Sequence, residues 1–341
     1  MEDGAQIQSQ PAITQSPTAT DQETDLGPLE DIRVVLIGKT GNGKSSSGNT
    51  ILNQVAFKTA LSPNSVTSEC RKARGVVDTS RVAVIDTPGI YDTKYKEEEV
   101  LRKLIQCISL SAPGPHAFLI VIRLGRFTQE EQNTVELLGQ VFGEEAAKYS
   151  MVLFTHGEQL RGNTIEDYFS RCGRLSYLIE KCNWRYHVFS NTNPMSGQVP
   201  QLLSKIKSMI SDNGGTFYTN SMYQEAEKAI QEEALKILKA RAEKKQRQEE
   251  QLRARLRGEV LQENMKLLEE EHKRVSREKA EKKNKFIKEG LVVTFAQVGV
   301  TIGAGVAVAA APLFMAIGAG VGGLIGAAVG VLGPAKDMYV L

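Results

Sequence analysis

Residues 38 to 45 have the sequence Gly-Lys-Thr-Gly-Asn-Gly-Lys-Ser, which matches the pattern G-x-x-x-x-G-K-S. The residues before it, Ile32 to Ile37, are mostly β-branched or aliphatic and predict a buried strand, whereas Ser46 to Leu52 can begin a helix. In the order strand, loop and helix, this pattern is typical of a phosphate-binding loop, in which backbone N–H groups approach an anion closely. The sequence therefore predicts a nucleotide-binding α/β domain.

The phosphate loop supplies most of the predicted nucleotide contacts. Lys44 would reach the β and γ phosphates, and Ser45 would hold Mg²⁺. The glycines allow the backbone to wrap around the phosphates. The predicted contacts are Gly38, Lys39, Thr40, Gly41, Asn42, Gly43, Lys44, Ser45 and Ser46.

A second signal is Asp86-Thr87-Pro88-Gly89, which ends the apolar run from Arg81 to Ile85. In phosphate-loop NTPases a carboxylate at such a strand end supports Mg²⁺, and a following glycine N–H can sense the γ phosphate. Taken alone, Pro-Gly is also ordinary turn chemistry. Between the two motifs lies the polar stretch 62–67, which predicts a switch loop. We assign Thr67 to the Mg²⁺ site, with Ser65 as the alternative and a solvated loop hydroxyl as the simpler interpretation.

Three longer stretches make the chain similar to one family, the AIG1-type, immunity-associated GTPases known as GIMAP proteins. These stretches are Gly38 to Asn49, the box from Leu110 to Thr128, and Tyr218 to Tyr223. The resemblance covers about Asp31 to Tyr223. It implies a septin- and Toc-like G domain that binds GTP and GDP, and an immune role is implied by the resemblance alone.

The base-recognition loop departs from the usual Thr/Asn-Lys-x-Asp pattern. After the strand from Tyr149 to Phe154 the chain has Thr155-His156-Gly157-Glu158, so that Glu158 stands in place of aspartate. A glutamate still offers a carboxylate to the two N–H donors of guanine, and a surface carboxylate without that role is the alternative. Ser190-Asn191 matches the family's second base-contacting loop. The predicted base contacts are Thr155, His156, Glu158 and Asn191.

A second departure concerns hydrolysis. Many GTPases carry a water-orienting glutamine directly after the switch glycine, but here Gly89 is followed by residues 90–92, Ile-Tyr-Asp. We therefore expect slow GTP hydrolysis that a second subunit or a partner accelerates. No catalytic residue is assigned; His116 and Arg126, together with Arg123, are candidates to act in trans, and a purely structural role is the alternative for each.

The composition of the chain gives no support for nucleic-acid binding or for a disulfide-stabilised fold. The chain has 42 Lys and Arg against 40 Asp and Glu, and this near balance gives no argument for nucleic-acid binding. Its four cysteines are scattered, which favours reduced thiols over a disulfide framework. The predicted organisation is a disordered polar segment at 1–27, a G domain at 28–215, a charged helical extension at 216–289, an apolar tail at 290–334 and a short end at 335–341.

The apolar tail has no charged residue from Gly290 to Pro334. On either side of Pro312 it supplies about the 20 residues that a membrane-spanning helix needs. The preceding segment, 273–288, has eight Lys or Arg against two Glu, as expected on a cytosolic membrane face. We predict a helical membrane hairpin; the competing interpretations are a Gly/Ala hairpin buried in an oligomer and one that lies on the membrane surface.

The predicted fold class is α/β: a phosphate-loop GTPase with a mostly parallel sheet flanked by helices, followed by long helices. The predicted function is Mg²⁺-dependent binding of GTP and GDP, with homodimerisation or homo-oligomerisation on a cytosol-facing intracellular membrane. The organelle stays open among endoplasmic reticulum, Golgi, mitochondrial outer membrane, lysosome and lipid droplet. A membrane scaffold with negligible hydrolysis and an ATP-using phosphate-loop kinase are the alternatives.

Overall fold

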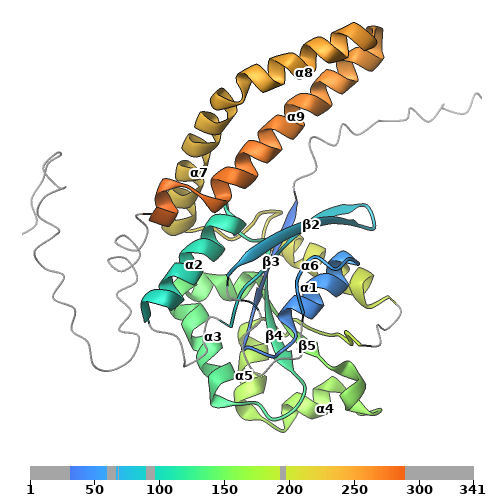
Figure 1. Cartoon of the computed structure of the whole chain (residues 1–341). Helices are drawn as coiled ribbons and strands as arrows, with labels where there is room; N and C mark the ends of the chain where they lie inside the picture. The colour runs from blue at the N-terminus through green and yellow to red at the C-terminus, as the bar shows by residue number, and fades with distance from the viewer. Residues whose placement is uncertain (1–30, 60–66, 68, 90–96, 193–196, 289–341) are drawn as a thin grey trace, which may run out of the picture. The chain divides into compact units, whose positions relative to one another are not determined.

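The computed structural model of this chain describes residues 31–59, 67, 69–89, 97–192 and 197–288. These residues form a mixed sheet with helices around it (Figure 1). In this described part the strand order is β2-β3-β1-β4-β5-β6. Strand β2 runs antiparallel to β3, and all other neighbours are parallel. The prediction of a mostly parallel sheet is therefore confirmed. The strands are β1 Ile32–Ile37, β2 Arg71–Val77, β3 Ser80–Asp86, β4 Ala117–Arg123, β5 Ser150–Thr155 and β6 Tyr186–Val188.

Helices cover both faces of this sheet, which explains why its central strands are apolar along their whole length. Within β1, Val34 and Leu36 belong to one core cluster, and Val35 and Ile37 to the other. The first cluster packs against α1 and α6, whereas the second packs against α2, α3 and α5. The elements are α1 Lys44–Leu52, α2 Glu97–Ser111, α3 Gln129–Phe142, α4 Ile165–Ser170, α5 Gly173–Lys181, α6 Gln198–Asp212, and the 3₁₀ helices η1 Glu144–Tyr149 and η2 Gly157–Leu160.

Three long helices follow, as predicted: α7 Ser221–Ala240, α8 Ala242–Arg255 and α9 Gly258–Lys282. Asn220 caps the N-terminus of α7, because its side chain accepts a hydrogen bond from the Tyr223 N–H at 3.1 Å. Buried residues of α7, including Tyr223 and Ile230, belong to the same core cluster as α2. The hydrophobic core of the G domain thus continues beyond residue 215, where the sequence suggests a domain boundary.

Helix α9 joins this core through a buried charge. Glu281 is only 1% exposed and pairs with Lys72 of β2 at 2.8 Å and with Arg277 at 3.3 Å. Its backbone carbonyl also accepts a hydrogen bond from the Ser109 hydroxyl of α2 at 2.8 Å. Arg277 in turn pairs with Glu227 of α7 at 2.7 Å. A single turn of α9 therefore contacts β2, α2 and α7.

Some sequence predictions fall outside the described residues. These are the polar segment 1–27, the apolar tail 290–334, the end 335–341, the alternative metal ligand Ser65, and residues 90–92. Among the helices that the structure describes, none is at once long and apolar enough to cross a bilayer. All four cysteines lie within the described ranges and are free thiols.

Candidate nucleotide-binding site

The phosphate loop connects β1 to α1, as the motif requires. Its first glycine, Gly38, has φ +154°, and a Cβ there would lie 2.4 Å from the Val121 carbonyl oxygen of β4. Gly43 caps α1 in the left-handed region, with φ +86°. Only residues without a side chain satisfy both positions. The loop therefore lies close to β4, and the N-terminus of α1 faces the space that the loop encloses.

Lys44 is the cation of this loop. Its Nζ atom donates hydrogen bonds to the backbone carbonyls of Gly38 at 2.8 Å and Lys39 at 2.9 Å. Burial lowers its pKa to about 8, and the neighbouring Asp86 carboxylate opposes that shift. A phosphate bound in the loop would add negative charge beside Lys44 and so favour its protonated form.

Three oxygen-bearing side chains meet next to Lys44. The Ser45 hydroxyl donates a hydrogen bond to Asp86 Oδ2 at 2.6 Å and lies 3.2 Å from Thr67 Oγ1. Asp86 is 1% exposed, and its second oxygen, Oδ1, has no hydrogen-bond partner among the described residues. Burial raises the pKa of Asp86, although the Ser45 hydrogen bond lowers it. Hydroxyl and carboxylate oxygens are the ligands that Mg²⁺ prefers, so this donor set fits the ion.

The predicted base loop follows β5. Thr155 donates a hydrogen bond from Oγ1 to the Asn42 carbonyl at 2.8 Å, which joins this loop to the phosphate loop. His156 has φ +61° and is the N-cap residue of η2, which contains Glu158. The exposed Glu158 carboxylate accepts a hydrogen bond from the Ser190 hydroxyl at 2.7 Å, and this bond lowers its pKa. Ser190 thereby holds the carboxylate in one orientation and ionised.

Asn191 lies beside the phosphate loop but uses both ends of its amide on α1. Its Nδ2 atom donates to Ser47 Oγ at 3.1 Å, and its Oδ1 atom accepts from Thr50 Oγ1 at 2.9 Å. In this arrangement Asn191 braces α1. Ser46 belongs to the same first turn, where its carbonyl accepts a hydrogen bond from Thr50.

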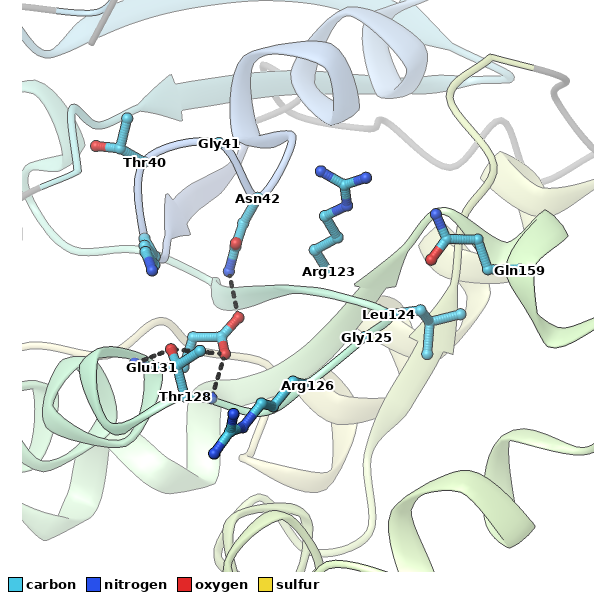
Figure 2. A pocket seen from close by; sticks show the side chains of 11 residues that line it. Thr40, Gly41, Asn42, Arg123, Leu124, Gly125, Arg126, Thr128, Glu131 and Gln159 are labelled. Atoms are coloured by element: carbon cyan, nitrogen blue, oxygen red, sulfur yellow. Dashed lines mark hydrogen bonds between the residues drawn. The ribbon is translucent and has the colours of Figure 1, made fainter. Parts of the chain in front are cut away.

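A cavity of about 450 Å³ opens beside the loop, between residues 39–42, the segment after β4 and Gln159 (Figure 2). Asn42 extends into it and donates from Nδ2 to Glu131 Oε1 at 3.0 Å. Glu131 also accepts from the Thr128 N–H at 2.8 Å, as part of a capping box at the start of α3. We did not predict Glu131 from the sequence, although the spacing Thr-x-x-Glu is a capping-box signature.

The three candidates for catalysis in trans lie in different places. Arg123 and Arg126 are exposed and line the cavity. His116 precedes β4 and therefore lies at the end of the sheet away from the phosphate loop. It is buried there, and its Nδ1 atom accepts a hydrogen bond from the Arg33 N–H at 3.0 Å. Because its ring serves this contact, the position does not support a role for His116 in hydrolysis.

The sequence comparison decides the family. A model of the AIG1 family matches residues 32–239. The chain belongs to the AIG1 family. The AIG1 match includes nearly all of α7, in agreement with the shared core of α7 and the G domain. The AIG1 resemblance inferred from the phosphate loop and the box that follows it is confirmed.

Curated AIG1 relatives are longer than the matched part. Human GTPase IMAP family member 8 is 35% identical over 196 residues, which are 56% of this chain and 30% of that protein. Immune-associated nucleotide-binding protein 9 of Arabidopsis thaliana is 36% identical over 213 residues, 60% of this chain and 61% of that protein. The chain thus covers less than two thirds of either relative. A solved structure of Arabidopsis Toc33 in complex with GDP and Mg²⁺ is 18% identical, with a TM-score of 0.44, and covers 53% of this chain and 85% of that one.

Proposed function

We propose that this AIG1-family chain binds GTP and GDP together with Mg²⁺ and hydrolyses GTP slowly. The observation that supports this most directly is the meeting of Lys44, Ser45 and Asp86 at the start of α1, with one buried carboxylate oxygen left without a partner. The ion would shield the phosphate charges, while Lys44 would contact the terminal phosphates. Ser45 and Thr67 would supply hydroxyl ligands, and Asp86 would support the ion, directly or through water.

Guanine specificity is the second part of the proposal. The Glu158 carboxylate, oriented by Ser190, would accept hydrogen bonds from the ring N–H and the amino group of guanine. Adenine lacks both donors in that arrangement. The Glu158 carboxylate therefore gains these hydrogen bonds only with guanine, so the site favours GTP over ATP, and each hydrogen bond to a charged group contributes about 1.5–3 kcal/mol.

Nucleotide competition on the full chain in detergent tests both parts. GTP, GDP, ATP and XTP would each displace a fluorescent guanine nucleotide in the presence of Mg²⁺. We expect strong displacement by GTP and GDP and weak displacement by ATP and XTP. Equal displacement by ATP would overturn guanine recognition and favour the phosphate-loop kinase.

The variant Ser45→Asn tests the metal site within the same assay. Asparagine removes the hydroxyl ligand and adds bulk beside Asp86, so we expect Mg²⁺-dependent GTP binding to fall by about 100-fold, which corresponds to about 2.7 kcal/mol. The control is Ser208→Asn on α6, because Ser208 is exposed and far from the loop in sequence. Ser68→Asn is not used, since Ser68 adjoins Thr67. Unchanged GTP affinity in Ser45→Asn would contradict the metal assignment.

The proposal includes association of two copies of this chain, which would accelerate GTP hydrolysis. The cavity that phosphate-loop residues 39–42 line also has two exposed cationic side chains in its lining, Arg123 and Arg126. An arginine supplied across an interface stabilises the charge that develops during phosphoryl transfer. A second copy of this chain would present the same two arginines. A scaffold that binds GTP without hydrolysing it is the alternative outcome.

Attachment to a cytosol-facing intracellular membrane completes the proposal. In the described part of the chain, α9 and the residues just after it expose Lys282, Lys283, Lys285 and Lys288. Basic residues near an anionic bilayer surface contribute about 1 kcal/mol each. Flotation of the full chain with phosphatidylserine vesicles, compared with neutral vesicles, tests this part. Absence of flotation with both kinds of vesicle would contradict it.

A further inference from the structure

The third residue of the phosphate loop, Thr40, has a polar atom that no described residue uses. Its Oγ1 atom is buried and has no hydrogen-bond partner within the described ranges. Buried hydroxyls are nearly always hydrogen-bonded, because an unsatisfied one is costly. Two other hydroxyl residues at the loop, Ser45 and Thr155, both donate to protein atoms. The Thr40 hydroxyl is thus available for a group that is not part of the described chain.

The position of Gly89 indicates where that group would lie. A Cβ added at Gly89 would stand 2.0 Å from Thr40 Oγ1 and 2.8 Å from the Thr40 backbone nitrogen. Gly89 therefore lies directly against Thr40, and only glycine fits there. Thr87, two residues earlier, donates to the Leu36 carbonyl at 2.6 Å and so fixes the start of this segment against β1. Because Gly89 lies against Thr40, a γ phosphate that meets the Gly89 N–H would lie near the Thr40 hydroxyl.

We propose that Thr40 is a catalytic residue that contacts the γ phosphate and the attacking water. The inference rests on the proposed GTP hydrolysis and names a residue for it. A threonine hydroxyl has one donor and two acceptor sites, so it can donate to a γ-phosphate oxygen and accept a hydrogen bond from water. The water oxygen forms a bond to the γ phosphorus while the bond from that phosphorus to the bridging oxygen of GDP breaks. One water proton moves to a γ-phosphate oxygen, which gives GDP and inorganic phosphate.

A water-orienting hydroxyl at Thr40 would replace the glutamine that is absent after Gly89. The water-orienting group would come from the rigid phosphate loop instead of the switch segment. Arg123 and Arg126 are exposed on the cavity side of the loop, so they suit charge stabilisation by a second copy. Thr40 and the two arginines therefore have separate tasks.

The test uses the full chain and three variants. Thr40→Val has nearly the same shape without the hydroxyl, Thr40→Ser retains the hydroxyl without the methyl group, and the exposed Thr219→Val is the matched control. We expect Thr40→Val to lower kcat for GTP about 100-fold, as for loss of one oriented transition-state contact. Thr40→Ser and Thr219→Val should stay within about threefold of wild type, and the affinity of Thr40→Val for GDP should change by less than about threefold. A kcat for Thr40→Val close to wild type, or an equal loss in Thr40→Ser, would overturn the proposal.

A binding measurement separates this inference from the proposed function. If the wild-type chain binds no guanine nucleotide, the proposed function itself fails, and the role of Thr40 fails with it. If the wild-type chain binds GTP but does not hydrolyse it, the role of Thr40 is tested by the ratio of the affinities for GMPPNP and GDP, compared between wild type and Thr40→Val. The contact with the γ phosphate predicts a ratio about 10- to 150-fold lower in Thr40→Val, as for loss of a hydrogen bond to a charged group. An unchanged ratio overturns the proposal.

Discussion

At the scale of single residues, the site combines common and unusual chemistry. Lys44 donates to the phosphate-loop backbone, and Ser45 donates to Asp86 beside it. Glu158 is the exception, because a longer side chain replaces the usual aspartate and needs the Ser190 hydroxyl to hold it. An exposed glutamate without that bond would sample several rotamers. In the proposed recognition of guanine, the hydrogen bond from Ser190 would offset part of the entropy cost of ordering Glu158.

The variant Glu158→Gln should change base preference. Xanthine has an oxygen where guanine has its amino group, and a glutamine amide can donate to that oxygen whereas a carboxylate repels it. We expect the ratio of GTP to XTP affinity to fall at least about tenfold, or about 1.4 kcal/mol. Competition with the two nucleotides measures it, with the exposed Glu180→Gln as the control. The same ratio in Glu158→Gln and wild type would mean that Glu158 does not contact the base.

At the scale of elements, α9 is held by electrostatic contacts that cross the fold. Glu281 and Lys72 are separated by 209 positions in the sequence, yet both are buried in one ion pair. Burial lowers the pKa of Lys72 to about 8, and Glu281 opposes that shift. Because β2 follows Thr67 and α2 follows the segment after Gly89, α9 contacts elements next to both predicted switch loops.

Removing one partner of this pair should destabilise the protein strongly. Glu281→Gln leaves the Lys72 charge buried beside Arg277, and we expect the free energy of unfolding to fall by about 3 kcal/mol. The double variant Lys72→Met with Glu281→Leu should lose less, because no buried charge remains. Chemical denaturation of the single and double variants measures the difference. Glu145→Gln is the control, since its ion pair with Lys148 is exposed and contributes about 0–1 kcal/mol. A double variant less stable than Glu281→Gln would contradict the explanation.

These contacts also mark the limit of sequence-based prediction. Local patterns were sufficient for β1, the phosphate loop, the strand that ends at Asp86 and the existence of long C-terminal helices. The pairing of Glu281 with Lys72 has no local pattern, because it depends on how α9 meets an antiparallel strand. Asn191 illustrates the same limit at the site: its position beside the loop followed from the motif, but its two hydrogen bonds to α1 depend on packing.

At the scale of the whole molecule, two copies of the chain are expected to cooperate in hydrolysis. GTP turnover per molecule should rise at least about tenfold as the chain is concentrated past its dimerisation constant, since an arginine supplied in trans contributes about 10³–10⁵-fold in related mechanisms. Steady-state hydrolysis over a range of protein concentrations measures this. Arg126→Ala should bind GTP normally and lose the increase, whereas the exposed Arg171→Ala on the surface should retain it. Turnover independent of concentration would favour the scaffold.

The stability of the whole chain should fall in mild acid because two histidines are buried in neutral form. Burial lowers the pKa of His116 and of His187 to about 4, below the ordinary value of 6.5. The unfolded chain therefore binds protons first, and the stabilisation from each neutral ring, complete above about pH 6.5, is lost as the pH falls toward about 4. Urea midpoints at several pH values between these limits measure the effect.

A double variant that replaces both histidines tests whether they cause this pH dependence. In His116→Asn the amide oxygen can accept the Arg33 N–H in place of Nδ1, and in His187→Gln the amide can donate to the Gln198 carbonyl. We expect the double variant to show a smaller drop in the urea midpoint between pH 7 and pH 5. An equally steep drop would assign the acid sensitivity to other groups.

The charged residues of β2 have a consequence for the behaviour of the protein in a crowded cell. Because β2 lies at one end of the strand order, its outer backbone groups could recruit a strand from another molecule. Its sequence begins Arg-Lys-Ala-Arg, and Lys72 and Arg74 are engaged by acidic residues of α9. At the opposite end, β6 has only three residues. The same charges that dock α9 thus protect the sheet against edge-to-edge aggregation, and a chain shortened before α9 should be more prone to form intermolecular β-structure.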